Sequence, residues 1–201
     1  MTKSIHSIIA ISFTCLIITR CTDSNTIKYY GFDENGLDER TIVISKPLRQ
    51  FKSFKELCDS INNIQCNDKK AALNVNSKNT IQTLKLIGQC RKKMISRHLR
   101  PRNILSIVDD SIISIVNHPI DSLENSLMKH YSNYGNSPYY AQTPERLLIR
   151  IRFIENELDE LPHLLNRIIL KHEELNSSNT LRIELYDIIS PPKPPGMQKP
   201  K

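Results

Sequence analysis

The chain has 201 residues, a formal net charge of +7, five Gly and no Trp. Its length fits one domain of ordinary size, and the shortage of glycine argues against a glycine-rich enzyme built of loops. A basic balance ordinarily suggests nucleic acid as a partner, but the export segment described next favours anionic lipid headgroups or acidic proteins instead.

The first 20 residues, 1–20, have the pattern of a signal peptide. Lys3 gives a positive start, and the mostly apolar run 8–19 is too short to cross a bilayer core of about 30 Å as a helix. The residues ITRC, which end at Cys21, resemble a bacterial lipobox, although Arg20 stands where a small residue is usual. The leading interpretation is cleavage before Cys21 and attachment of lipid, such as palmitate, to its thiol. Plain secretory cleavage nearby is the alternative.

Lipidation would place the mature chain in the cell envelope. Thr22 is not the aspartate that retains bacterial lipoproteins at the inner membrane, so the rule for such lipoproteins implies the outer membrane, with the protein facing the periplasm. Removal of residues 1–20 takes away Lys3 and Arg20 and lowers the formal charge from +7 to +5.

Residues 21–50 are interpreted as the lipidated cysteine and a polar tether, followed by a helical periplasmic domain over 51–189. The turn residues Glu34-Asn35-Gly36 leave open a hairpin between strands at 29–32 and 41–44.

Two helices are expected at the start of the domain. Ser53 and Glu56 fit a capping box. The apolar face that follows consists of Phe54, Leu57, Ile61 and Ile64. Residues 67–79 suggest a loop, and a second helix is expected from Ile81 to Leu99, closed by Pro101. Its inner face would carry Ile81, Leu84, Ile87, Ile95 and Leu99.

The cysteines predict one disulfide. If Cys21 carries lipid, Cys58, Cys66 and Cys90 remain in an oxidising compartment, so one bridge and one leftover thiol follow. A bridge between Cys66 and Cys90 would staple the two predicted antiparallel helices, and its loop of about 25 residues is worth roughly 3 kcal/mol. No C-x-x-C pair is present, so no metal site is predicted.

The middle of the chain alternates apolar segments with a polar loop. Residues 104–116 suggest a short buried helix around Asp109-Asp110, although their β-branched content leaves a strand open. A helix is expected from Asp121 to Tyr131. Its inner face would carry Leu123, Leu127 and Tyr131. In the predicted loop 133–142, Tyr139 and Tyr140 either pack back onto the domain or anchor a partner.

The most regular pattern runs from Thr143 to Leu175. Thr143-Pro144 is a helix start signal, and the apolar positions that follow alternate in steps of four and three, which is typical of a heptad-patterned helix. Pro162 predicts a kink or a break into two helices. The heptad positions are Leu147, Ile151, Ile154, Leu158, Leu161, Leu165, Ile168, His172 and Leu175.

Three arginines, Arg146, Arg150 and Arg152, lie in the first half of this predicted helix. Cations near a helix N-terminus oppose the helix dipole, so local helix stability does not explain them. Contact with an acidic partner surface would explain them, and the three arginines are therefore the predicted partner-binding residues. A packed core helix with a solvated charged face is the alternative.

Nothing in the sequence predicts catalysis. It contains no nucleophile elbow, P-loop, H-E-x-x-H or dinucleotide fingerprint, so no catalytic residue, cofactor or enzyme activity is expected. His163 and His172 are nine residues apart and do not share a helix face well. A short amphipathic run covers 181–189, and the Pro- and Lys-rich tail 190–201 is expected to be disordered.

Several of these residues together resemble the QseG family of enterobacterial outer-membrane lipoproteins. They are the lipidatable Cys21, Cys66-Asn67-Asp68 followed by Cys90, and the segment TPER at 143–146 leading into RIRFIENELDELP. The resemblance covers about residues 50–175 and departs from the family at Arg20, at the extra Cys58 and in the short segment after 175.

The resemblance implies a lipid-anchored, non-catalytic partner of the periplasmic domain of a QseE-type sensor histidine kinase, one that supports two-component signalling. In pathogens the family is also associated with type III effector delivery and virulence. The alternative is a pilotin-like assembly lipoprotein of a secretion or conjugation system. A secreted virulence factor is a third class. The fold expected in each case is a small, mainly α domain with a disulfide-stapled helix pair and one long heptad-patterned helix.

Overall fold

The computed structural model describes residues 26–32, 37–77, 80–90, 100–114, 117–154, 158–175 and 180–187. The predicted signal peptide, Cys21 and the tail 190–201 lie outside these residues, as does the part 91–99 of the predicted second helix. Within the described ranges, no helix combines the length and the apolar character needed to span a bilayer.

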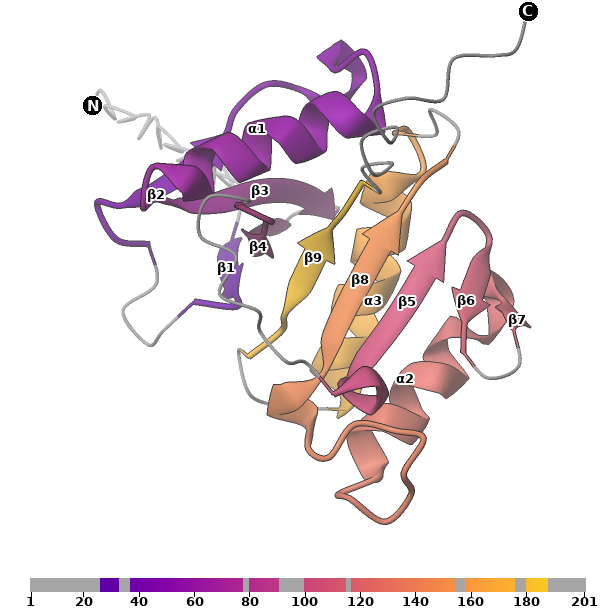
Figure 1. Ribbon diagram of the computed structural model, residues 1–201. Coiled ribbons are helices and arrows are strands. Elements are labelled where there is room, and N and C mark those ends of the chain that lie inside the picture. Colours follow the sequence, from indigo (N-terminus) through magenta and orange to yellow (C-terminus); the bar gives the residue numbers. More distant parts are fainter. Residues whose placement is uncertain are drawn as a thin grey trace, which may run out of the picture.

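The domain is an α/β fold, so the prediction of a mainly α domain is wrong. The nine strands described form one mixed sheet in the order β2-β3-β4-β9-β8-β5-β6-β7, with β1 paired to β4 off this path. The α-helices α1, α2 and α3 pack on this sheet (Figure 1).

The segment interpreted as a tether contributes two strands to the sheet. β1 (Thr26–Tyr30) runs parallel to the first part of β4 (Thr80–Ile87), and β2 (Thr41–Ile44) runs parallel to β3 (Lys70–Ser77). The two strands therefore do not form the alternative hairpin either. Both find their partners far along the chain, a relation that local turn residues do not encode.

A glycine at the end of β1 allows the backbone to pass close to the segment before β9. β9 (Ile183–Leu185) pairs with the end of β4, beyond the residues that β1 occupies. Gly31 has φ +77°, and a Cβ at this position would lie 2.5 Å from the backbone oxygen of Leu181. Any other residue would therefore meet both a steric clash and an unfavourable backbone conformation.

The first helix, α1 (Phe54–Cys66), begins as the capping pattern predicts. The backbone N–H of Glu56 donates to Ser53 Oγ at 3.2 Å. Phe54, Leu57 and Ile61 are buried, so the predicted apolar face packs inward. The 3-10 turn η1 (Leu48–Gln50) precedes it.

The predicted loop at 67–79 is wrong, since 70–77 forms β3. Ala71 and Ala72 are both buried, and from Leu73 on the buried residues Leu73 and Val75 alternate with Asn74 and Asn76, which are exposed. This period of two is the pattern of a strand with one buried face.

The predicted helix from Ile81 is a strand as far as Ile87. The spacing of Ile81, Leu84 and Ile87 fits a helix, but β4 has β3 on one edge and β1 and β9 on the other. Gln82, Thr83 and Leu84 are all buried in succession. A strand that is covered on both faces loses its alternation, so periodicity alone does not separate it from a buried helix.

The disulfide between Cys66 and Cys90 is present, with the two Cα atoms 5.1 Å apart. It joins the end of α1 to the segment after β4, and not two antiparallel helices. Beside it, Gly88 N–H donates to Gln65 Oε1 at 2.9 Å. Cys58 is the free, buried thiol, and burial raises its pKa to about 12.

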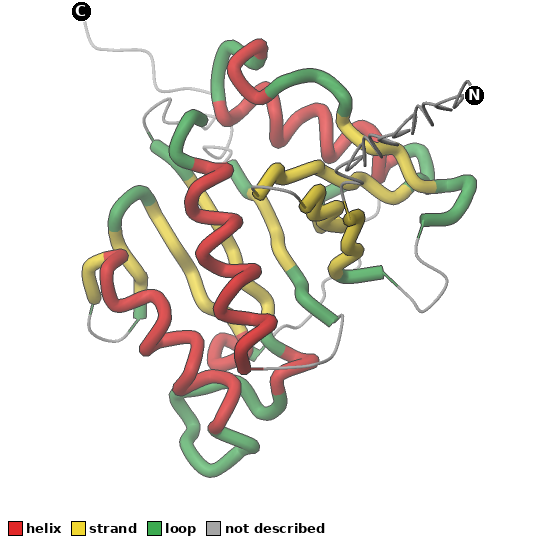
Figure 2. The backbone as a smooth tube through the Cα atoms, turned by 180° about the vertical axis from the view of Figure 1, so that it is seen from behind, coloured by secondary structure: helices red, strands yellow, loops and turns green. Residues whose placement is uncertain are grey.

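The second half of the chain is a parallel unit. β5 (Ile104–Val108), β8 (Leu148–Arg152) and β9 lie side by side in parallel. Parallel neighbours need crossover connections, which contain α2 (Leu123–Ser132) and α3 (Leu161–Leu175). Both helices cover the same face of these strands (Figure 2).

An antiparallel extension lies beside β5. β6 (Ser111–Ile113) pairs with β5 across a tight turn in which Asp109 has φ +47°, and β7 (His118–Pro119) pairs with β6. The strand alternative for this segment is therefore confirmed. The 3-10 turns η3 (Pro101–Asn103) and η4 (Ile120–Ser122) precede β5 and α2. The predicted inner face of α2 is buried as expected.

The predicted heptad helix from Thr143 to Leu175 is wrong. The 3-10 turn η5 (Pro144–Arg146), strand β8 and helix α3 occupy this region in succession. Pro162 lies in the first turn of α3, where its missing N–H costs no hydrogen bond, so it helps to start a helix and does not kink one. Ile154, a predicted heptad position, is 62% exposed.

The histidine in the predicted heptad stripe belongs to a buried polar cluster. A hydrogen bond of 2.5 Å joins Tyr131 Oη on α2 to His172 Nδ1 on α3. The Tyr30 hydroxyl on β1 donates to Glu173, which also pairs with Lys28 at 2.6 Å. The contacts with Glu173 attach β1 to α3, and the bond between Tyr131 and His172 joins α2 to α3.

Candidate binding cleft

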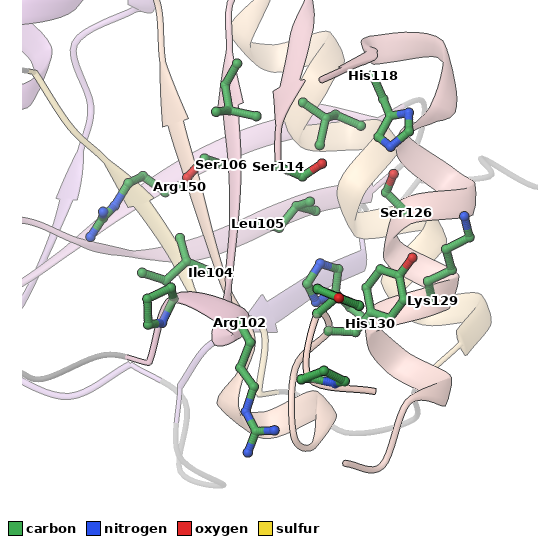
Figure 3. Close-up of a pocket in the computed structure, with 16 residues that line it drawn as sticks. Arg102, Ile104, Leu105, Ser106, Ser114, His118, Ser126, Lys129, His130 and Arg150 are labelled. Carbon is green, nitrogen blue, oxygen red and sulfur yellow. The ribbon is translucent and has the colours of Figure 1, made fainter. Parts of the chain in front are cut away.

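A cavity of about 690 Å³ opens beside α2, between this helix, the β5–β6 hairpin and the loop 138–140 (Figure 3). We call it the α2 cleft. The lining near the start of β5 consists of Pro101, Arg102, Ile104 and Leu105. The rest comes from Ile112 to Ser114, His118, three residues of α2 and residues 138–140, with Ser106 and Arg150 at one side. None of the sixteen lining residues is Asp or Glu.

Helical spacing places the α2 residues of the cleft together. Ser126, Lys129 and His130 are three and four residues apart, so they share one helix face. Leu127 and Tyr131 turn toward the core. Figure 3 shows His118, Ser126, Lys129 and His130 gathered on the α2 side of the cavity.

The β5–β6 hairpin supplies the apolar side of the cleft. Leu105 and Ile112 are buried, whereas Ile113 is 40% exposed at the rim. Tyr139, on the loop 138–140, is 63% exposed. The cleft therefore offers water-exposed apolar and aromatic surface beside cationic side chains, which is the composition of many binding surfaces.

One buried amide holds the tyrosine loop in place. Asn133, just after α2, donates through Nδ2 to the carbonyl oxygens of Ser137 and Ala141, at 3.0 and 2.8 Å. Its Oδ1 accepts from the backbone N–H of Ser137 at 2.7 Å. Asn133 is itself buried, so these bonds are shielded from water. Tyr139 and Tyr140 are thus presented on a loop that is organised before any ligand binds.

His130 connects the helix to the same loop. Its Nδ1 accepts from the backbone N–H of Ala141 at 3.0 Å, and its ring meets the ring of Tyr140 edge to face, with centroids 5.3 Å apart. Burial lowers the pKa of His130 to about 4. The imidazole is therefore neutral at pH 7, with Nδ1 available as an acceptor.

The burial of His130 predicts a pH dependence of stability. Between about pH 6.5 and about pH 4 the unfolded chain takes up a proton that the folded chain does not, so stability falls as pH falls through this window. The slope contributed by His130 is at most about 1.4 kcal/mol per pH unit. In urea unfolding, His130→Asn, which keeps an acceptor, should show a smaller slope than the wild type, because only the contribution of His130 is lost.

His163→Asn, at an exposed position of α3, is the matched control and should keep the wild-type slope. An unchanged slope in His130→Asn would contradict the assignment of the pH dependence to the buried imidazole.

The three predicted partner-binding arginines do not lie on one helix face. Arg150 and Arg152 are on strand β8. Arg146 is exposed in the turn η5, where its Nη1 donates to Gln142 Oε1 at 2.8 Å. Arg150 borders the α2 cleft, but Figure 3 shows its guanidinium pointing away from the α2 side. A role of these arginines in partner binding stays a prediction.

Arg150 already has partners within the domain. Its Nε donates to Glu184 Oε2 at 2.5 Å, and its guanidinium lies 5.1 Å from the ring centroid of Tyr186. Only 7% of the Glu184 side chain is exposed, so this ion pair is largely shielded. Its position favours a structural role for Arg150.

Sequence reasoning missed most of the cleft. It named Tyr139 and Tyr140 as possible anchors, and the structure places both at the cavity. Arg102, Lys129 and His130 carried no sequence signal of their own, because they meet only after β5, α2 and the tyrosine loop have packed. Within the described ranges, no three His, Cys, Asp or Glu side chains gather as a metal site.

No family model, no curated protein and no solved structure matches this chain. The class that the fold and the cleft define is an α/β domain with a preformed basic and aromatic cavity.

Proposed function

We propose that this protein is a non-catalytic binding domain of the cell envelope, and that the α2 cleft holds a segment of another molecule. The observation that carries the proposal is the cleft itself. It is a preformed cavity of ordinary ligand-site volume, with exposed apolar and aromatic groups at its rim and cationic side chains beside them.

The chemistry of the lining favours binding over catalysis. General acid–base work needs a group whose pKa lies near the working pH and whose orientation a partner fixes. His130 has its pKa at about 4, and its Nδ1 is occupied by the N–H of Ala141. No carboxylate in the lining is available to orient His118 as a base.

The envelope location rests on the disulfide and on the sequence. A bridge between Cys66 and Cys90 fits an oxidising compartment. The lipid anchor at Cys21 and the outer-membrane location remain proposals from the sequence. A sensor kinase becomes a weaker choice of partner, because part of the segment that suggested it, residues 148–152, is a strand inside the sheet.

A cavity-filling variant tests the proposed function. Ser126 faces the cleft from α2, whereas Met128 on the same helix is 44% exposed and does not line it. We expect peptides selected by the wild-type protein from a displayed random library to lose affinity for Ser126→Trp by about tenfold or more, because the indole occupies their site. Met128→Trp should bind them as wild type does.

Peptides that bind wild type and Ser126→Trp equally well would show that the α2 cleft is not the binding site. Unchanged thermal unfolding of both variants, measured beside the wild type, ensures that the loss reports on the cleft and not on folding.

A further inference from the structure

We infer that the α2 cleft recognises an acidic polypeptide segment with an apolar or aromatic anchor residue. This inference rests on the proposed function and names the chemistry of the ligand. It combines two observations, namely cations without carboxylate partners on either side of the cavity and exposed apolar surface between them.

The charge of the cleft is uncompensated. Arg102, on η3, and Lys129, on α2, both line it, and no Asp or Glu does. Neither side chain forms an ion pair within the part of the chain that the structure describes. Figure 3 shows Arg102 at the lower end of the cavity and Lys129 on its α2 side, so an elongated ligand could meet both.

Several cations elsewhere in the domain have carboxylate partners within it. On the same helix as Lys129, Glu124 pairs with Arg167 of α3 at 3.0 Å. Lys46 pairs with Glu56 at 2.8 Å, and Lys70 with Asp38 at the same distance. These cations are matched by the domain's own carboxylates. Arg102 and Lys129 instead leave two positive charges at one cavity, where a ligand of opposite charge would match them.

The apolar part of the cleft argues for a polypeptide over a small free anion. Tyr139 and Ile113 expose 63% and 40% of their surface at the rim, and Leu105 and Ile112 form the buried wall. Covering this surface needs an apolar side chain, which inorganic phosphate lacks. A peptide offers such a side chain and carboxylates at a fixed spacing, and a cavity of about 690 Å³ accommodates a few residues.

The tyrosine loop is prepared for this role. The buried Asn133 and His130 fix its backbone through the bonds to Ser137 and Ala141 described above. A loop that is already ordered loses little conformational entropy on binding, so short acidic segments can bind measurably. The ligand chosen by the cleft is thus set by Arg102, Lys129 and the exposed rim.

The test uses the full-length chain and fluorescently labelled synthetic peptides. The first peptide has phenylalanine flanked on each side by two acidic residues, the second has the matching amides, and the third has glycine in place of phenylalanine. Inorganic phosphate and vesicles containing phosphatidylglycerol are the competitors. Fluorescence anisotropy gives the affinity of each peptide for wild type, for Arg102→Glu with Lys129→Glu, and for Tyr139→Ser.

We expect the acidic phenylalanine peptide to bind wild type best. The double charge reversal should lower the affinity for this peptide by about tenfold or more, because two attractions become repulsions. Added salt should also lower the affinity of the wild-type protein for this peptide. Tyr139→Ser should lower the affinity for the peptide that carries phenylalanine, and it should lower the affinity for the glycine peptide less. Arg49→Glu, an exposed reversal on η1 outside the cleft, should change nothing.

Other outcomes overturn the inference in distinguishable ways. If the amide peptide binds as tightly as the acidic one and Ser126→Trp abolishes both, the cleft is a binding site but its ligand is not acidic. If phosphate displaces the peptide at low concentration, the cleft binds a free anion. If the vesicles do so, the cleft binds a lipid headgroup. If neither peptide responds to Ser126→Trp, the proposed function fails as well.

Discussion

Ile149→Ala should lower the free energy of unfolding by about 2–5 kcal/mol, the range for large-to-small changes at buried aliphatic positions. Ile149 is 1% exposed and lies in the centre of the sheet, between β5 and β9. Its side chain is part of the hydrophobic core that includes the inner faces of α2 and α3. Urea unfolding followed by circular dichroism measures the effect.

Ile154→Ala is the matched control and also discriminates between the two interpretations of this segment. In the heptad pattern Ile154 is a core position and Ile149 lies off the stripe, whereas in the structure Ile154 is 62% exposed. We therefore expect Ile154→Ala to change the unfolding free energy by no more than about 0.5 kcal/mol. A larger loss at Ile154 than at Ile149 would restore the heptad helix and contradict the strand.

Removal of the disulfide should have an effect of similar size. Cys66 and Cys90 are 24 residues apart in sequence, so opening this loop in the unfolded chain costs about 3 kcal/mol of stability in the chain-entropy model. Cys66→Ser combined with Cys90→Ser should unfold at lower urea concentration than the oxidised wild type, and a reducing agent should no longer affect its stability.

Cys58→Ala supplies the control for the disulfide. It removes the buried free thiol and leaves the bridge, so reduction should still destabilise this variant by about the same amount as wild type. Equal stability of the oxidised and reduced wild-type protein would contradict a stabilising role of the Cys66–Cys90 bridge. The bonds from Gly88 and Gln89 to the amides of α1 would then suffice to hold this corner of the fold.

The errors at β4 and at β8, which were both predicted to be helical, have one physical origin. Residues 147–175 contain a buried strand followed by an amphipathic helix. The apolar positions of the strand and those of the helix are spaced so that together they form one series in steps of three and four. Ile149 and Ile151 alternate as in a strand, but Leu148 is also buried, which hides the period of two. β4 misleads in the same way, because it is covered on both faces.

Local signals did determine several features of this protein. Residues close in sequence determine the N-cap at Ser53 and the buried apolar faces of α1 and α2. Cys66 is joined to Cys90 because few other cysteines are available as partners. The parallel pairings of β1 with β4 and of β8 with β9, by contrast, depend on which strands meet after the helices have packed. The α2 cleft is decided at the same stage. Arg102, Lys129 and Tyr139 are separated by up to 37 positions and become neighbours of one cavity only because β5, α2 and the loop held by Asn133 pack together.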